Sequence, residues 1–218
     1  MIEQLVPAGV AGHESFTDVP ESLMLPAEAA QVSKAVEKRR REFGTVRHLA
    51  RRALAELGLD PVALLPGKQR EPLWPAGVVG SLTHCAGYRA AVVARAVEVH
   101  SIGIDAEPHG PLPEGVLEAV TVPDELPRLE ALTSADPTVH WDRMLFSAKE
   151  SVYKTWFPLA GRWLGFEDAS ITLAPGGTFR AELLVPGPRV AGVELTGFTG
   201  RWLVGSGLVL TAICLPVQ

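Results

Sequence analysis

The sequence is poor in cysteine, has no long apolar run and carries no excess of basic residues. Two cysteines, Cys85 and Cys214, cannot supply a framework of several disulfides. The longest uncharged stretches, residues 72–88 and 202–218, are broken by glycine and proline, which argues against a membrane span. The first ten residues lack the basic region of a secretory signal. We therefore expect a soluble, reduced, cytoplasmic protein with no membrane partner.

The 218 residues carry 20 basic and 25 acidic side chains, and the net charge of -5 excludes a globally basic nucleic-acid binder. The charge is unevenly distributed: residues 28–70 contain ten basic and five acidic residues, whereas residues 101–136 contain eight acidic residues and Arg128 alone. Such an arrangement suits a site that binds an anion beside a metal ion. It equally describes two solvated surfaces, the interpretation that charge counting alone favours.

Apolar spacing and composition predict two long helical regions. Residues 27–57 are rich in helix-forming residues, and we expect Gly44 to divide them, with Thr45 capping the second helix and Gly58 ending it. Residues 139–156 carry apolar side chains three or four positions apart, which predicts one long helix.

The rest of the chain is typical of short strands separated by glycine and proline turns. Residues 1–26 are expected to form an extended lead-in, and the acidic residues 114–136 a short helix. Strands, or a mixture of strands and helix, are expected at residues 77–82, 90–97 and 101–104. Short strands are expected at residues 169–173, 179–185, 193–198, 202–205 and 208–215. Because helices and strands are interleaved without a regular βαβ rhythm, the fold class is α+β.

The apolar run at residues 102–104 ends in two carboxylates, Asp105 and Glu107. Residues two apart on a strand point to the same side, so the two negative charges repel each other and favour a cation between them. A set of oxygen ligands favours Mg²⁺ or Mn²⁺ over Zn²⁺. The alternative, which spacing alone favours, is a strand end that turns into solvent at Pro108.

Residues 146–154, FSAKESVYK, place Glu150 and Lys154 four positions apart on one helix face. By themselves these two residues indicate an ordinary ion pair. A capping box of Ser147 with Glu150 is disfavoured, because the apolar stripe that begins at Trp141 places the serine inside the helix.

Two further segments contain candidate binding residues. GSLTHCAG at residues 80–87 lacks the G-x-S-x-G pattern of a hydrolase, and His84 and Cys85 face opposite sides of a strand, which disfavours a Cys–His pair. A lone histidine is usually structural, although His84 could bind phosphate near a basic helix. The basic run at residues 38–41, with Arg47, favours a solvated surface, and a phosphate-rich ligand is the alternative.

Taken together, these segments resemble phosphopantetheinyl transferases of the surfactin/enterobactin type, in particular their actinobacterial branch. The matching stretches are KRRREFGTVRHLARRAL, GSLTHCAGYRAAVVA, SIGIDAEPH, WDRMLFSAKESVYKTWFPL and GRWLGFED. The resemblance implies an enzyme that moves the 4′-phosphopantetheine arm of coenzyme A to a serine of acyl or peptidyl carrier proteins, with Mg²⁺ (or Mn²⁺), releasing 3′,5′-ADP. It also implies two lobes related by a pseudo-two-fold axis, each a small antiparallel sheet packed on a long helix, at residues 1–100 and 101–218.

The same resemblance implies a set of site residues. The metal ligands would be Asp105, Ala106 through its carbonyl, Glu107 and Glu150. Asp105, Glu150 and Lys154 would be catalytic, with Glu150 either a base for the carrier serine or only a ligand, and Lys149 is a second choice beside Lys154. The residues that would bind coenzyme A are Arg39, Arg47, Lys68, Arg70, Thr83, His84 and Lys154.

Two other functions remain open at this point. A Mg²⁺-dependent hydrolase of nucleotides or phosphoesters would use the same three carboxylates with water as the nucleophile. A non-catalytic coenzyme A-binding module is disfavoured, because such a module need not retain all three carboxylates. In each case we expect a monomer with no nucleic-acid partner.

Overall fold

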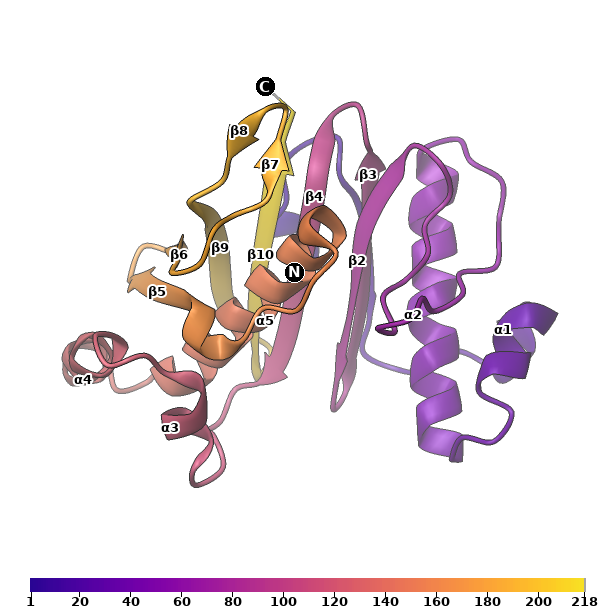
Figure 1. Cartoon of the computed structure of the whole chain (residues 1–218). Coiled ribbons are helices and arrows are strands. Elements are labelled where there is room, and N and C mark those ends of the chain that lie inside the picture. The colour runs from indigo at the N-terminus through magenta and orange to yellow at the C-terminus, as the bar shows by residue number, and fades with distance from the viewer. Residues whose placement is uncertain (218) are drawn as a thin grey trace.

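The structure, a computed structural model, describes residues 1–217 and confirms an α+β fold with antiparallel sheets. Four layers follow one another: helix α2 (Glu37–Glu56), a three-stranded sheet, a five-stranded sheet and helix α5 (Trp141–Ala160) (Figure 1). Within these residues, every helix is too short or too polar to cross a bilayer.

The first sheet has the strand order β1-β3-β2, and its neighbours are antiparallel. Its strands are β1 (Ala11–Ser15), β2 (Val78–Cys85) and β3 (Tyr88–Arg95). Strand β1 lies in the segment expected to be only an extended lead-in, because pairing with β3 gives that segment a partner that the local pattern does not reveal. Helix α2 buries Leu49, Ala53 and Leu54 against Val93 of β3.

Helix α2 continues through Gly44, so the predicted division at this residue is wrong. The interruption lies earlier, between α1 (Pro26–Gln31) and α2. A Cβ atom at position 44 would lie 2.8 Å from Cγ of Met24, so the glycine permits Met24 to pack closely against the helix. Thr45 is not an N-cap, since its hydroxyl donates to a carbonyl one turn back. Gly58, with a φ of +72°, follows the helix end as predicted.

The second sheet has the order β4-β10-β9-β6-β5, again antiparallel. Its strands are β4 (Val99–Pro108), β5 (Ala169–Ala174), β6 (Thr178–Leu183), β9 (Gly197–Gly205) and β10 (Leu208–Pro216). The predicted long helix is α5, which buries Leu145, Val152 and Trp156 against this sheet. The smaller elements are α3 (Val116–Val120), α4 (Glu125–Ala135), the hairpin β7 (Arg189–Val190) and β8 (Val193–Glu194), and the 3₁₀ turns Ile2–Gln4, Glu21–Leu23 and Phe166–Asp168.

The two sheets pack against each other through a shared apolar cluster. This cluster joins Val92 of β3, Ile104 of β4 and Leu210 of β10 with Ile2 and Leu5 from the start of the chain. The core therefore draws on both of the ranges expected as separate lobes, 1–100 and 101–218.

Side chains link the edges of the two sheets. The hydroxyl of Ser81 on β2 accepts the backbone N–H of Ile104 on β4 at 3.1 Å, and the hydroxyl of Thr83 accepts that of Ala106 at 3.1 Å. We call this contact the β2–β4 seam. It connects the polar end of β4 to the first sheet.

Candidate active site

A cleft of about 620 Å³ lies between the α2–β2 half and helix α5. It brings together seven residues that the sequence singled out: Arg39, Arg47, Arg70, Thr83, His84, Glu150 and Lys154. Lys68 is not among the lining residues, although its neighbours Gln69 and Arg70 are. The cleft therefore joins the basic helix of the first half to Glu150 and Lys154 on α5. The predicted ligands Asp105, Ala106 and Glu107 are not among its lining residues.

Asp105 and Lys154 form the centre of the site. Lys154 reaches from α5 to β4, where its Nζ donates to Oδ1 of Asp105 at 2.7 Å and to the carbonyl of Ile104 at 3.1 Å. Burial alone would lower the pKa of Lys154, but the carboxylates of Asp105 and Glu150 outweigh it and raise that pKa above its usual value. Lys154 is therefore held as a cation beside the carboxylates.

Glu150 lies one helical turn before Lys154 and lines the same cleft. Burial raises the pKa of its carboxyl, Lys154 lowers it, and the negative charge of Asp105 raises it further. The net effect is a carboxylate that holds a proton more readily than an exposed glutamate. Such a group is a stronger base than an exposed glutamate, which suits general acid–base chemistry.

Glu107 has a cationic partner that the sequence analysis did not identify. Arg143 on α5 donates to its Oε2 at 3.1 Å and also to the carbonyls of Gly110 and Pro111. Burial and the charge of Asp105 nevertheless raise the pKa of Glu107 to about 7. A signal for Arg143 was available, because it precedes Glu150 by seven positions and hence lies on the same face of α5.

The carboxylates of the site offer oxygen donors of the kind that a hard divalent cation prefers. Oδ2 of Asp105 is buried and has no hydrogen-bond partner among residues 1–217. Oxygen donors with raised pKa values are groups that a hard cation would stabilise as anions. As arranged in the described chain, no three acidic, histidine or cysteine side chains are close enough to form a complete metal site. Lys154 and Arg143 instead neutralise Asp105 and Glu107.

The basic end of the cleft is built around Arg39 and His84. Arg39 Nη1 lies 2.8 Å from Nε2 of His84, and Glu42 lies 3.7 Å from the other ring nitrogen. Burial lowers the pKa of His84; Glu42 opposes this effect and Arg39 adds to it. The imidazole is therefore neutral at pH 7, and Arg39, whose side chain is 43% exposed, supplies the accessible positive charge.

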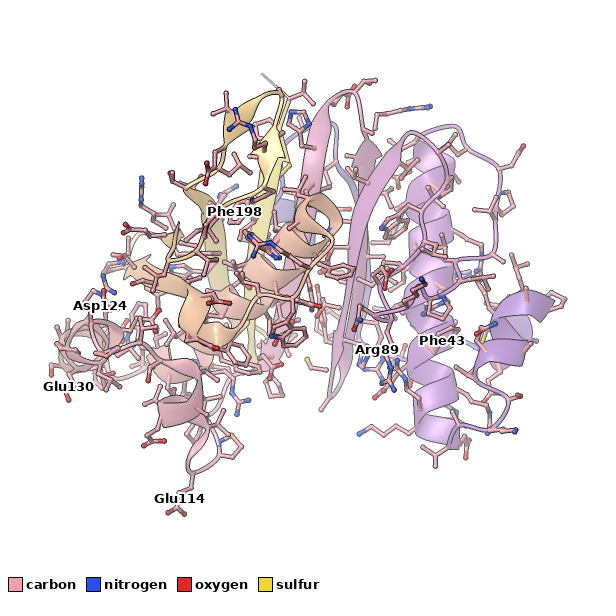
Figure 2. All side chains as sticks on the ribbon, viewed as in Figure 1. Phe43, Arg89, Glu114, Asp124, Glu130 and Phe198 are labelled. Carbon is pink, nitrogen blue, oxygen red and sulfur yellow. The ribbon has the colours of Figure 1, made fainter. Side chains whose placement is uncertain are left out.

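Arg47 is more deeply engaged than its position in the sequence suggests. Its guanidinium stacks on Phe43, with Cζ 3.2 Å from the ring centroid, and its Nε donates to the carbonyl of Leu64 at 2.8 Å. Burial lowers its pKa to about 10, which still leaves it charged at pH 7. Figure 2 shows Phe43 on α2 and, nearby, Arg89, a buried residue that pairs with Asp18.

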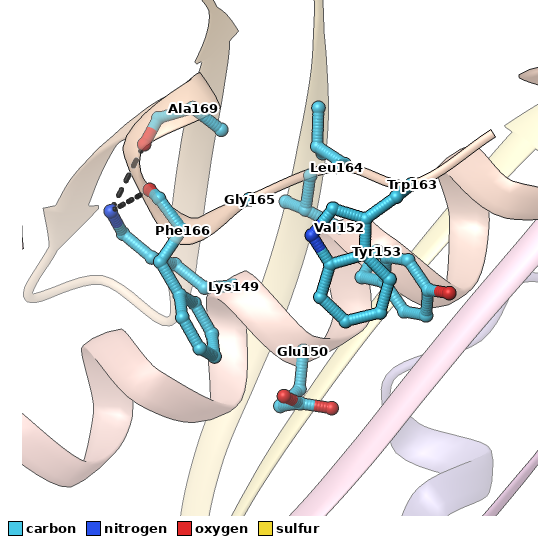
Figure 3. Close-up of a pocket in the computed structure, with 9 residues that line it drawn as sticks. All are labelled: Lys149, Glu150, Val152, Tyr153, Trp163, Leu164, Gly165, Phe166 and Ala169. Carbon is cyan, nitrogen blue, oxygen red and sulfur yellow. Dashed lines mark hydrogen bonds between the residues drawn. The ribbon is translucent and has the colours of Figure 1, made fainter. Parts of the chain in front are cut away.

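A second pocket, of about 110 Å³, adjoins the cleft and shares Glu150 and Tyr153 with it (Figure 3). Tyr153, Trp163 and Phe166 give it an aromatic lining. Lys149 is buried beneath it, where its Nζ donates to the carbonyls of Phe166 and Ala169 and pairs with Glu125 at 2.9 Å. Lys149 thus anchors the loop that forms the pocket and does not point into the main cleft.

Most of the acidic excess of residues 101–136 lies away from the site. Figure 2 shows Glu114, Asp124 and Glu130 around α3 and α4, pointing outward. Only Asp105 and Glu107 from that range belong to the carboxylate group described above. The charge imbalance thus combines a solvated surface with an anionic centre.

Comparisons with known proteins identify the family of the chain. The family model for the 4′-phosphopantetheinyl transferase N-terminal domain matches residues 27–94, and that for the 4′-phosphopantetheinyl transferase superfamily matches residues 101–202.

Three curated relatives cover almost the whole chain. The 4′-phosphopantetheinyl transferase Svp of Streptomyces mobaraensis is 55% identical over 99% of this chain and 89% of its own length. Npt of Nocardia iowensis is 53% identical over 98% and 99%, and PptT of Mycobacterium tuberculosis is 50% identical over 99% and 98%. The chain therefore belongs to the 4′-phosphopantetheinyl transferase superfamily and is a transferase that moves phosphopantetheine from coenzyme A to carrier proteins.

Proposed function

We propose that transfer takes place in the cleft between β2 and α5, with Glu150 as the base and Lys154 as the cation beside the reacting phosphate. The observation that carries this proposal is that Glu150 and Lys154 line one cleft and that Lys154 bonds at 2.7 Å to Asp105, whose Oδ2 is buried and unpaired among residues 1–217. An anionic ligand fits the basic end of the cleft, and a cation fits the acidic end.

Coenzyme A would lie along this cleft. Its 3′-phosphate would meet Arg39 and His84, with Arg47 and Arg70 lining the same end, and its pyrophosphate would meet Lys154. Lys68 does not line the cleft, so we propose only a peripheral contact between this residue and the nucleotide. The aromatic pocket beside Glu150 is suited to the uncharged part of the phosphopantetheine arm, because the two pockets share Glu150 and Tyr153.

The reaction exchanges the phosphoanhydride bond of coenzyme A for a phosphate ester to serine. The carrier serine oxygen forms a bond to the phosphorus that bears pantetheine, and the bond from that phosphorus to the bridging oxygen of 3′,5′-ADP breaks. Glu150 accepts the serine proton, which its raised pKa permits. Lys154 stabilises the charge on the pyrophosphate oxygens during the exchange.

Asp105, Glu107 and Glu150, with the carbonyl of Ala106, would hold a divalent cation. When bound, a cation of this class neutralises negative charge on a pyrophosphate. We propose Mg²⁺, with Mn²⁺ as a substitute, because all the donors are oxygens.

The proposal also covers the symmetry of the lobes, the partners, the oligomeric state and the location. A pseudo-two-fold relation of lobes 1–100 and 101–218 is supported by two long helices, α2 and α5, that each pack on an antiparallel sheet. We further propose acyl and peptidyl carrier proteins as partners, a monomeric enzyme and a cytoplasmic location.

The test is the intact mass of an apo-carrier protein after incubation with coenzyme A and Mg²⁺. Glu150→Gln and Asp105→Asn should remove the phosphopantetheine mass increase while the melting temperature stays close to that of the wild type. Glu114→Gln, at an exposed position, is the matched control and should transfer normally. A Glu150→Gln variant with wild-type turnover would refute the proposed base.

Two further controls separate the competing functions. EDTA should abolish transfer, and Mg²⁺ or Mn²⁺ but not Ca²⁺ should restore it, because longer Ca²⁺–oxygen bonds alter the geometry at the pyrophosphate. Rescue by Zn²⁺ alone would contradict a carboxylate site. Consumption of coenzyme A without any carrier would instead indicate a hydrolase.

A further inference from the structure

Thr83 lies in the β2–β4 seam, and its hydroxyl contacts the protein on both sides. The residue is 3% exposed. Its Oγ1 accepts the backbone N–H of Ala106 at 3.1 Å and donates to Oδ1 of Asp105 at 3.3 Å. The resemblance implied that this hydroxyl contacts coenzyme A, whereas the structure directs it toward β4.

The hydrogen-bonding capacity of the hydroxyl decides between the two roles. A threonine hydroxyl has a single proton to donate, so it cannot serve Asp105 and a phosphate oxygen at the same time. Because the Ala106 N–H already supplies a donor to Oγ1, the proton is directed to the carboxylate. A phosphate contact would require this arrangement to break.

The contacts of Asp105 are asymmetric. Thr83 and Lys154 both bind Oδ1, whereas Oδ2 is buried and has no partner within residues 1–217. Two donors on one oxygen fix the orientation of the carboxylate and leave the second oxygen free. That free oxygen is the one that a cation can use.

We propose that Thr83 is a positioning residue that orients Asp105 across the seam, and not a phosphate-binding residue. This inference rests on the role of Asp105 in the proposed function. It extends that function by assigning part of the control of the metal-binding carboxylate to a residue of the first sheet.

Ser81 provides a matched control within the same seam. Its hydroxyl accepts the N–H of Ile104 at the same distance, 3.1 Å, and it is 4% exposed. Its recorded contact in the seam is to backbone and not to a carboxylate. Loss of either hydroxyl removes one bond to the β4 backbone, but only loss of the Thr83 hydroxyl also removes one of the two bonds to Oδ1 of Asp105.

The first experiment measures kcat and KM for coenzyme A in Thr83→Val, Thr83→Ser and Ser81→Ala, with saturating carrier and Mg²⁺. Thr83→Val should lower kcat by ~10–100-fold, the usual effect of losing a group that orients a metal ligand, with KM for coenzyme A unchanged. Thr83→Ser retains the hydroxyl and should restore kcat. Ser81→Ala should keep the wild-type kcat even if Ser81→Ala and Thr83→Val both lower the stability of the fold.

The second experiment needs neither metal nor turnover. Amide hydrogen exchange in EDTA should become faster at Ala106 in Thr83→Val and at Ile104 in Ser81→Ala. The affinity for 3′,5′-ADP, measured by calorimetry in EDTA, should not change in Thr83→Val. A contact to phosphate would instead weaken that affinity.

The outcomes separate this inference from the function on which it rests. A wild-type protein that leaves the carrier unmodified overturns the proposed function, and this inference with it. If the wild type is active, an unchanged kcat in Thr83→Val overturns the positioning role alone. Loss of 3′,5′-ADP affinity in Thr83→Val, or unchanged exchange at Ala106, overturns it as well.

Discussion

Two carboxylates of the site, Glu107 and Glu150, have pKa values above those of exposed carboxylates. Asp105 has Lys154 at 2.7 Å and Glu107 has Arg143 at 3.1 Å, yet burial still raises the pKa of Glu107 to about 7. One nearby cation therefore does not compensate fully for burial beside a second carboxylate. A metal ion bound at Glu107, as proposed above, would compete with a proton near neutral pH.

The pKa of Glu107 predicts how stability depends on pH in the metal-free protein. The folded state binds this proton more tightly than the unfolded chain, where the pKa is about 4.5. The resulting stability is present in full below about pH 4.5 and is lost as the pH rises through about 7. In urea unfolding with EDTA, the wild type should lose stability relative to Glu107→Gln between about pH 4.5 and 7. A constant difference between the two proteins would contradict the raised pKa.

Arg39 should discriminate between coenzymes with and without a 3′-phosphate. Arg39→Ala removes an accessible charge next to His84, and loss of a charge-assisted hydrogen bond costs about 1.5–3 kcal/mol. The variant should raise KM for coenzyme A by a corresponding factor while KM for 3′-dephospho-coenzyme A changes little. Arg41→Ala, which removes an exposed arginine paired with Glu37, is the control. Equal effects on both coenzymes would place the 3′-phosphate elsewhere.

Among the elements, the contact between β4 and α5 determines the distance between Asp105 and Lys154. Gly103 lies on β4 directly against α5, where a Cβ atom would clash with the carbonyl of Ser151 and the hydroxyl of Thr155. On the neighbouring strand β10, the hydroxyl of Thr211 lies 2.6 Å from the hydroxyl of Ser151. The absence of a side chain at position 103 allows the helix that carries Glu150 and Lys154 to lie close to the strand.

Gly103→Ala should therefore affect both stability and activity. The added methyl group forces α5 away from β4, and such overpacking costs about 1–3 kcal/mol. Because Lys154 must then span a longer distance to Asp105, kcat should fall even at temperatures where the variant is fully folded. Gly176→Ala, where a Cβ atom meets no other atom within 4 Å, is the control. Urea unfolding and the carrier mass assay would measure the two effects, and a stable, fully active Gly103→Ala would refute the packing argument.

At the level of the whole molecule, the cleft depends on contacts between the two sheets. Val92, Ile104 and Leu210 belong to one apolar cluster that both halves complete, together with Ile2 from the start of the chain. Within the β2–β4 seam, the Thr83 hydroxyl then connects the first sheet to the carboxylate of Asp105. In the proposed function, coenzyme binding and chemistry would thus rely on different halves over a common core.

The second half should not fold alone. Residues 101–218 expressed separately lose Ile2, Leu5 and Val92 from the apolar cluster, which exposes one face of β4 and β10 to water. We expect this fragment to bind a hydrophobic dye and to melt without a cooperative transition by circular dichroism, in contrast to the full chain. A fragment that melts cooperatively with native near-ultraviolet signals would show that the two ranges are independent folding units.

Several features of the site could be predicted from local sequence because they depend on periodicity. The spacing of two on a strand placed Asp105 and Glu107 together, and the spacing of four on a helix placed Glu150 and Lys154 on one face. Arg143 and the seam role of Thr83 were missed, because their partners lie 36 and 22–23 positions away along the chain. Helix α2 was wrongly divided at Gly44, because the packing partner that explains this glycine, Met24, lies on another segment.

The sequence alone determined the α+β class, the long helix that became α5, the chemical types of the site residues and, through the ordered motifs, the family. These properties follow from local propensity, side-chain chemistry and the order of residues. The tertiary structure decided which charges meet: Lys154 with Asp105, Arg143 with Glu107, and Lys149 with Glu125 away from the cleft. Burial and pairing depend on how separate elements pack, so they set the pKa of Glu107 and the orientation of Asp105 only once the fold is complete.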